Sequence, residues 1–152
     1  MSELTIMIYD SGHKELKAYL MSLKGILDVV IENEKQLKIY IKYNPDLITL
    51  KVIKMEILLF LNLLNLPSII AFDKHSTIKN SVYKIIRDDI CCEYCLNGSI
   101  EELFDMEGIE KVESNFYEKE YGEKGTVVIN IKYNPDLISN DDMKQIELKL
   151  NI

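Results

Sequence analysis

The sequence has little basic character. Its 18 lysines and arginines are outnumbered by 25 aspartates and glutamates, which gives a formal net charge of −7. Nonspecific nucleic-acid binding needs clustered basic residues that displace counterions from phosphates, so we expect no nucleic-acid partner. With 47% hydrophobic and 28% charged residues, the 152-residue chain is predicted to be soluble and globular. Its length allows one ordinary domain or two small ones.

Long apolar segments are also absent. The most hydrophobic stretch, residues 57–72, is interrupted by Asn62, Asn65, Pro67 and Ser68. It is also shorter than the ~20 residues that a membrane-spanning helix needs. The N-terminus lacks the basic start and apolar core of a signal peptide. We therefore expect no membrane insertion and a cytoplasmic location.

The sequence lacks a recognisable catalytic motif. It contains no glycine-rich phosphate loop and no HExxH zinc motif, and no Ser/His/Asp combination can be identified in it. Its two histidines, His13 and His75, have too few ligand-type neighbours in the sequence for a metal site. We interpret both histidines as exposed or helix-capping. The sequence therefore predicts a protein that is not an enzyme.

Cysteine is scarce and confined to one place. The chain has three cysteines, Cys91, Cys92 and Cys95, within five positions. A disulfide framework would spread its cysteines to close long loops, whereas such a cluster in a reducing compartment is typical of a metal-binding or redox site. Two thiolates three positions apart, on a loop that enters a helix, can converge on one soft ion such as Cu(I) or Zn(II).

What the sequence does contain is an internal repeat. The octapeptide Ile-Lys-Tyr-Asn-Pro-Asp-Leu-Ile occurs at 41–48 and again at 131–138, ninety positions later. A Gly-Ile pair precedes each copy, at 25–26 and 108–109, and helix-like sequence flanks both. The duplication therefore covers nearly the whole chain. Because only the second copy has cysteines, we assign the shared residues to the fold and the cysteines to function.

Apolar periodicity predicts the elements of each copy. In the first copy Gly25 is expected at a left-handed helix end and Thr49 as a helix N-cap. The first copy is predicted to have strands over 4–9, 27–31, 37–43 and 68–72 and helices over 14–24 and 49–64. The order βαββαβ is the ferredoxin-like split unit. The second copy is predicted to have strands over 81–86, 111–117 and 126–133, a helix over 98–107 capped by Asn97 or Ser99, and a helix that opens at 139–140.

The second copy ends early. About twelve residues follow Asn140, which is too few for a full helix and a closing strand. We expect a continued helix and no fourth strand, although the alternating residues 147–152 leave a closing strand as the alternative. An absent strand would leave unpaired backbone groups that something else must cover. The predicted fold class is α+β, with two tandem ferredoxin-like βαββαβ modules, the second lacking its last strand. Residues 1–73 form a degenerate module without cysteines, and residues 81–152 form the module with the Cys-x-x-Cys motif.

The second copy resembles the heavy-metal-associated domain family, which includes cytosolic copper chaperones and the N-terminal domains of copper-transporting ATPases. That family combines Met-x-Cys-x-x-Cys, an amphipathic helix, Gly-Val, two strands and a Tyr-Asp-Pro-like turn. The resemblance spans about residues 82–146 and is carried by Ile90–Cys95, Glu107–Ile109, Val112 and Tyr133–Asp136. Ile90 stands where the family has methionine, and Asp89 stands where it has glycine.

The resemblance implies that Cys92 and Cys95 bind a thiophilic ion, most often Cu(I), with Zn(II) or Cd(II) as alternatives. It also implies a role in metal binding, delivery or sensing, with a membrane metal transporter as a partner. Cys91 is left open as a third ligand or a small buried residue. The alternative is a non-catalytic interaction or scaffold protein that uses the same fold without a physiological metal. A thioredoxin-like redox role is less favoured, because the surrounding elements do not match a thioredoxin βαβ pattern.

The helix predicted from Leu50 is apolar around nearly its whole circumference. The apolar residues are Val52, Ile53, Met55, Ile57, Leu58, Leu59, Phe60, Leu61, Leu63 and Leu64. A helix of this kind is buried on more than one side. We expect one side to cover its own sheet and the other to meet the second module or another subunit. The sequence therefore predicts a homo-oligomer or a tightly docked pair of modules.

Overall fold

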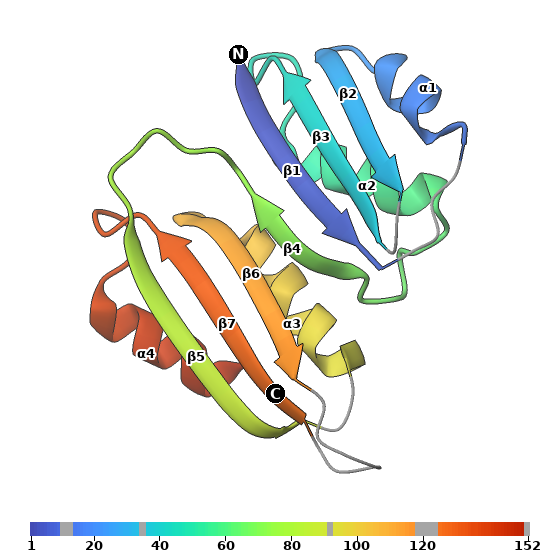
Figure 1. Ribbon diagram of the computed structural model, residues 1–152. Coiled ribbons are helices and arrows are strands. Elements are labelled where there is room, and N and C mark those ends of the chain that lie inside the picture. Colours follow the sequence, from blue (N-terminus) through green and yellow to red (C-terminus); the bar gives the residue numbers. More distant parts are fainter. Residues whose placement is uncertain (10–13, 34–35, 91–92, 118–124, 151–152) are drawn as a thin grey trace.

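The computed structural model describes residues 1–9, 14–33, 36–90, 93–117 and 125–150. In these ranges the chain forms one seven-stranded antiparallel sheet, with four helices on one face of it (Figure 1). The strands are β1 (Ser2–Ile8), β2 (Ile26–Asn33), β3 (Leu37–Tyr43), β4 (Ile69–Asp73), β5 (Ser81–Ile90), β6 (Ile109–Tyr117) and β7 (Gly125–Tyr133). The helices are α1 (Leu16–Met21), α2 (Leu50–Phe60), α3 (Glu93–Asp105) and α4 (Asn140–Lys149). No helix in the described ranges combines the length and the apolar character that crossing a bilayer requires.

The first half of the chain, β1 to β4, has the element order βαββαβ and the strand order β2-β3-β1-β4. Side chains alternate between the two faces of each strand. On β1 this alternation turns Leu4, Ile6 and Ile8 towards the helices, where they are fully buried. Glu3 and Met7 lie on the opposite face of the sheet, which the helices leave uncovered and which we call the open face.

The second half has the element order β5-α3-β6-β7-α4 and the strand order β6-β7-β5. Residues 140–149 form a helix, as the sequence predicts, and Ser139 caps it together with Asp142 in a capping box. Within the described residues no strand follows this helix. The outer edge of β5 is therefore one end of the sheet, and β2 is the other.

The two halves meet where β4 pairs with β6, which we call the seam. Phe72 lies opposite Val112, and Asp73 lies opposite Lys111. On the helix face α3 crosses this seam, with the ring of Phe104 edge-on to that of Phe72 at a centroid distance of 4.9 Å. The buried residues of both halves thus form one hydrophobic core. The division into a module of residues 1–73 and a module of residues 81–152 stays a prediction.

A charged contact reinforces the seam on the helix face. The Nζ of Lys54, on α2, donates to both carboxylate oxygens of Asp105, on α3, at 2.6 Å each. Lys54 is buried to 9% exposure, so its ammonium group is compensated there rather than by water. This contact holds one flank of α2 against the second half. The other flank, with Val52, Met55 and Leu59, is about half exposed.

The exposed flank bears on the prediction, made from the apolar character of α2, that this helix is buried on more than one side. The described residues show the expected contact with the second half at Lys54, which pairs with Asp105. The helix also ends at Phe60 rather than at residue 64, and Asn62 takes a left-handed conformation with φ of 58°. Asparagine tolerates that conformation better than most residues. The homo-oligomer itself stays a prediction.

The repeated octapeptide builds the same corner twice. After β3, the N–H of Asn44 donates to the carbonyl of Gly25 at 2.7 Å, and after β7 the N–H of Asn134 donates to the carbonyl of Gly108 at the same distance. Both glycines have positive φ, +101° and +93°. The side chain of an isoleucine, Ile138 in the second copy, packs directly on each glycine. The shared residues therefore hold the end of a helix to the end of a strand.

The start of α3 differs from the prediction. The helix begins at Glu93 rather than near Gly98, so Asn97 and Ser99 lie inside it. The hydroxyl of Ser99 donates to the carbonyl of Cys95, four residues earlier, at 3.2 Å. Serine inside a helix commonly bonds to a carbonyl of the preceding turn, and serine is also common at helix N-caps. The sequence alone therefore does not distinguish a serine that caps a helix from one inside it. The predicted cap at Thr49 is confirmed, because its hydroxyl accepts the N–H of Val52.

We predict opposite effects for alanine at two glycines. At Gly108 an added Cβ would lie 3.0 Å from Ile138 at a φ of +93°, so Gly108→Ala should lower the free energy of unfolding by about 1–3 kcal/mol. Gly98 lies inside α3, and a Cβ there would meet Pro67 at an ordinary 3.7 Å. Gly98→Ala should therefore raise it by about 0.5–1 kcal/mol. Urea unfolding monitored by circular dichroism measures both, and a stable Gly108→Ala protein would contradict the role given to the corner.

A second prediction concerns Glu101 on α3. Burial raises the pKa of its carboxyl above the ordinary value of 4.5, Lys54 opposes this shift, and Asp105 adds to it. Because this pKa is raised, the contribution of Glu101 to the stability of the fold is fully present below pH 4.5. It is lost as the pH rises through the pKa of the folded state. Glu101→Gln should therefore melt at a higher temperature than the wild type at about pH 7 and lose this advantage at about pH 4. The exposed neighbour Glu102 supplies the control, Glu102→Gln, and an equal gain from both substitutions would contradict the explanation.

Candidate metal centre

The cysteine motif lies at the junction of β5 and α3. The strand ends at Ile90 and the helix begins at Glu93. Cys95 is the third residue of the helix and is exposed. Cys91 and Cys92 lie outside the described residues, as does His13. Of the predicted ligands, the structure thus describes Cys95, which is accessible at the first turn of a helix.

Directly after Cys95 the side chains of α3 are buried. Leu96, Asn97 and Ile100 are exposed by 6% or less, so the first turns of α3 are firmly seated. A Cβ built on Gly98 would lie 3.7 Å from Pro67, in the loop between α2 and β4. The first half of the chain has no cysteines, yet its own loop lies beside the helix that carries Cys95.

Between the two halves, at this end of α3, lies a hollow of about 430 Å³. The first half lines it with Tyr9 and Gln36, and the second half with Leu96, Asn97 and Asn115. Its walls are polar and apolar in similar measure. A partner that approaches Cys95 from this side would therefore contact both halves of the chain.

The chemistry at this place is that of an exposed cysteine side chain at the beginning of a helix. Thiolates bind soft ions such as Cu(I) and Zn(II), and backbone N–H groups at a helix start favour negative charge. In the part of the chain that the structure describes, no three His, Cys, Asp or Glu side chains gather in a way that could hold a metal ion. Cys91 and Cys92, the predicted partners of Cys95, lie outside that part of the chain.

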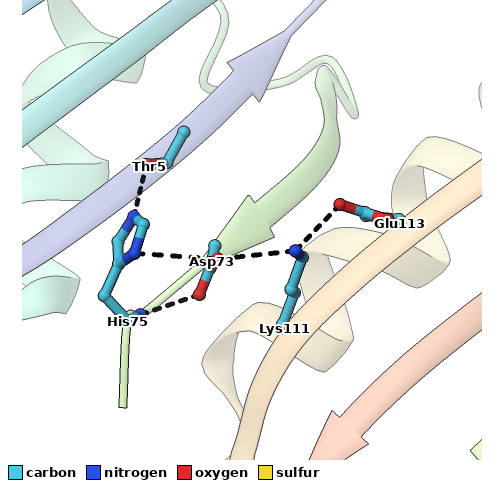
Figure 2. Close-up of polar contacts among 5 residues, drawn as sticks. All are labelled: Thr5, Asp73, His75, Lys111 and Glu113. Atoms are coloured by element: carbon cyan, nitrogen blue, oxygen red, sulfur yellow. Dashed lines mark hydrogen bonds and ion pairs between the residues drawn. The ribbon is translucent and has the colours of Figure 1, made fainter. Parts of the chain in front are cut away.

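A second polar cluster lies at the seam, on the open face of the sheet (Figure 2). His75 follows β4 and turns back over β1, where its Nε2 lies 2.6 Å from the hydroxyl oxygen of Thr5. The backbone N–H of His75 donates to Asp73 Oδ1 at 2.8 Å. Across the seam, Lys111 Nζ lies 3.6 Å from Asp73 and 3.0 Å from Glu113. Glu113, with Asp73 in second place, raises the pKa of Lys111 above its ordinary value.

The order hydroxyl, imidazole, carboxylate in this cluster is that of a nucleophilic triad, but the geometry is not. His75 Nδ1 is 3.7 Å from Asp73 Oδ2, beyond hydrogen-bond range, and Asp73 is engaged instead by the backbone N–H and by Lys111. Thr5 is 6% exposed. We assign the cluster a structural role, in which it fixes the start of the 74–80 segment to β1 and to β6.

The sequence did not reveal the partners of His75. It is exposed, as expected, but it caps no helix and instead links β1 and β4 through Thr5 and Asp73. Asp73, two residues earlier, is a signal for an Asx turn, which could have been recognised. Thr5 is seventy residues away in the sequence, and no local pattern points to it. His75 also has a positive φ of 49°.

Comparisons with known proteins leave the family open. No protein-family model and no curated protein matches the chain. Among solved structures, the solution structure of the N-terminal soluble domains of Bacillus subtilis CopA is similar, with 16% sequence identity and a TM-score of 0.36. The alignment covers 98% of this chain and 88% of that one. A similarity of this strength carries no argument, so membership of the heavy-metal-associated family stays a prediction.

The seam cluster predicts a measurable cost for one hydroxyl. Thr5→Val keeps the shape of the side chain but removes the hydrogen bond to His75, so the free energy of unfolding should fall by about 1 kcal/mol. Thr77→Val, at an exposed position of the following segment, should change it by less than about 0.5 kcal/mol. Guanidinium chloride unfolding measures both, and equal values for the two variants would show that the bond between Thr5 and His75 contributes nothing.

Proposed function

We propose that the chain is a cytoplasmic protein that binds a thiophilic metal ion through the thiolates of Cys92 and Cys95. It acts in metal binding, delivery or sensing rather than in catalysis. Cu(I) is the ion we favour, with Zn(II) or Cd(II) as alternatives. The observation that carries this proposal is the exposure of Cys95 in the first turn of α3, three residues after Cys92.

The beginning of α3 supports the pairing of these two thiolates. Cys92 is the residue before Glu93, the first helical residue, and Cys95 is the third residue of the helix. Two cysteines three positions apart at the start of a helix can hold one soft ion between their thiolates. Structural Zn(II) sites take four protein ligands, whereas the Cys-x-x-Cys motif provides two soft ones. Two thiolates suit Cu(I) best, and Cys91 is either a third ligand or a small buried residue.

We further propose that the fold is a tandem of two ferredoxin-like modules of the heavy-metal-associated type. The same element order, βαββα, in both halves supports this assignment, as do the two matching corners at Gly25 and Gly108. The first module is then a degenerate copy without cysteines, and the second has lost its last strand. In this arrangement the first module supports the metal centre through the loop at Pro67.

Delivery of the ion to a membrane metal transporter is the partner reaction we propose. Ligand exchange requires that an incoming thiolate reach the metal while the first ligands still hold it. The exposure of Cys95 at the molecular surface meets that requirement. The hollow beside α3 gives such a partner a surface from both halves to contact.

A second candidate function is that of an interaction scaffold without a physiological metal. The exposed flank of α2 favours it, because Val52, Met55 and Leu59 are each 45–49% exposed on one side of a single helix. An apolar patch of this kind can mark a protein-binding surface. This candidate predicts a partner bound through α2 and no tight metal binding.

Anaerobic titration of the reduced chain with Cu(I), in competition with a chromophoric Cu(I) chelator, tests the metal proposal. We expect one tightly held ion per chain. Cys92→Ser and Cys95→Ser should each abolish that binding, because each leaves a single thiolate of the proposed pair, which cannot hold the ion against the chelator. Cys91→Ser is the matched control in the same segment, and it should retain one ion per chain.

Circular dichroism of the apo variants shows whether each remains folded. If Cys91→Ser also weakens binding, three thiolates hold the ion. If the wild type binds Cu(I) no more tightly than a monothiol such as glutathione, the metal proposal fails and the scaffold candidate takes its place. Parallel titrations with Zn(II) and Cd(II) rank the ions.

A further inference from the structure

Among the residues that the structure describes, the outer edge of β5 is open, whereas the matching edge of β1 in the first half is covered by β4. β1 pairs with β3 on one side and with β4 on the other. β5 pairs with β7 in the same register that joins β1 to β3, from Ser81 opposite Tyr133 to Arg87 opposite Val127, and the register then shifts before Ile90. Within the described residues no strand occupies the other side of β5. An open strand edge presents unpaired N–H and C=O groups that can pair with another chain.

On the helix-facing side of β5, the polar side chains already have partners within the chain. The registers place Tyr83 and Arg87 where β1 has the buried Leu4 and Ile8. The hydroxyl of Tyr83 donates to Glu147 Oε2 at 2.9 Å, and Arg87 Nη1 lies 3.4 Å from Glu147 Oε1. This side of β5 therefore needs no apolar strand like β4 to complete a core. The side chains on the open face of β5 therefore determine which strand can pair with this edge.

On the open face the side chains of β5 alternate in a symmetric pattern. Val82 and Ile86 are 64% and 53% exposed, and Lys84 and Asp88 are exposed between and beyond them. Lys84 lies two residues before Ile86, and Asp88 two residues after it. Asp88 is held on this face by a hydrogen bond from the hydroxyl of Thr126, at 2.7 Å. An antiparallel strand reverses residue order, so this pattern complements a second copy of itself.

We propose that β5 is the interface of a two-fold symmetric dimer, in which two copies of the chain pair antiparallel about Ile86. In that register Ile86 faces Ile86 of the second copy, and Lys84 faces Asp88 twice. Directly opposite residues on antiparallel strands have Cβ atoms about 4.5–5.5 Å apart, within reach of an ion pair. A two-fold axis perpendicular to the sheet keeps all helices on one face, so the two sheets join into one.

Neighbouring registers lack this complementarity. Pairing about Lys84 places that lysine opposite itself, and pairing about Ile85 places Lys84 opposite Ile86. The pairing is also closed, because each copy uses the same edge, so assembly stops at two copies.

The other end of the sheet cannot pair in the same way. On β2 the exposed Asp28 and Glu32 flank Val30 at the same spacing. Two copies of β2 paired about Val30 would therefore set Asp28 opposite Glu32, acid against acid. Like charges directly opposite destabilise a strand pair. The charge pattern thus selects β5 and rejects β2 as the self-pairing edge.

Sedimentation velocity of the full chain in reducing buffer, over a range of concentrations, tests the proposal. We expect a species of twice the 17.7 kDa chain mass. Lys84→Asp or Asp88→Lys alone should weaken association by roughly tenfold or more, because two attractive pairs become repulsive. The combined variant Lys84→Asp/Asp88→Lys should restore association. Replacing the three cysteines by serine should leave the dimer intact, so this test stands apart from metal binding.

Two controls make the result specific. Asp28→Lys changes a charge at the opposite edge and should leave association unchanged, and Thr126→Val removes the hydrogen bond to Asp88 without changing a charge. A wild type that stays monomeric at every concentration overturns the proposal, as does a dimer that Lys84→Asp leaves intact. Dissociation by Asp28→Lys would mean head-to-tail pairing of β5 with β2. A folded double variant that stays monomeric would also overturn it, with thermal melts reporting the folding of each protein.

Discussion

The edge-to-edge pairing of β4 with β6 holds the two halves of the chain in one sheet, and the packing of the helices follows from it. β4 is bounded by β1 on one side and β6 on the other, so the five-residue strand serves both halves. Its Phe72 faces the helices and meets Phe104 of α3, which crosses the seam. On the open face Asp73 reaches Lys111. Removing this pairing would expose apolar side chains of both halves to water, which is unfavourable in free energy.

The same constraint explains how the second half manages with three strands of its own. A three-stranded sheet with helices on one face is close to the lower limit of independent stability. β4 supplies a fourth strand, which pairs with β6. In the first half β4 pairs instead with β1, the counterpart of β5. The polar residues Tyr83 and Arg87, anchored on Glu147, finish the side that stays open. In the described residues, the second half thus has a neighbouring strand at its β6 edge and none at its β5 edge.

Division of labour between the copies follows from what they share. Gly25 and Gly108 take the same backbone conformation and receive the same hydrogen bond, so the octapeptide serves the corner and not a ligand. Cys95 has no counterpart in the first half. What the first half does provide is contact, through Pro67 against α3 and through Tyr9 in the neighbouring hollow. The first half thereby shapes the surroundings of the start of α3, where Cys95 lies.

Much of the local structure could be predicted from residue patterns, whereas the long-range contacts could not. Alternation along residues 37–43 marks β3 from end to end, and Thr49 and Ser139 mark two helix starts. The start of α3 was misplaced because Asn97 and Ser99 look like caps from sequence alone. The seam had no local signal, since pairing of Phe72 with Val112 depends on which edges the fold leaves free. The same holds for the bond of His75 to Thr5 and for the exposed edge of β5. For Cys92 and Cys95, the motif itself remains the main evidence.

The seam also gives the chain a direction in time. A ribosome releases β1 to β4 first, and the hairpin-like and local contacts of that half can form before residue 81 has appeared. The free edge of β4 is then a template with which β6 can pair as it emerges. The pairing across about forty residues, slow to find between two disordered segments, becomes the addition of one strand to a finished surface. The first half would thus assist the folding of the second through the free edge of β4.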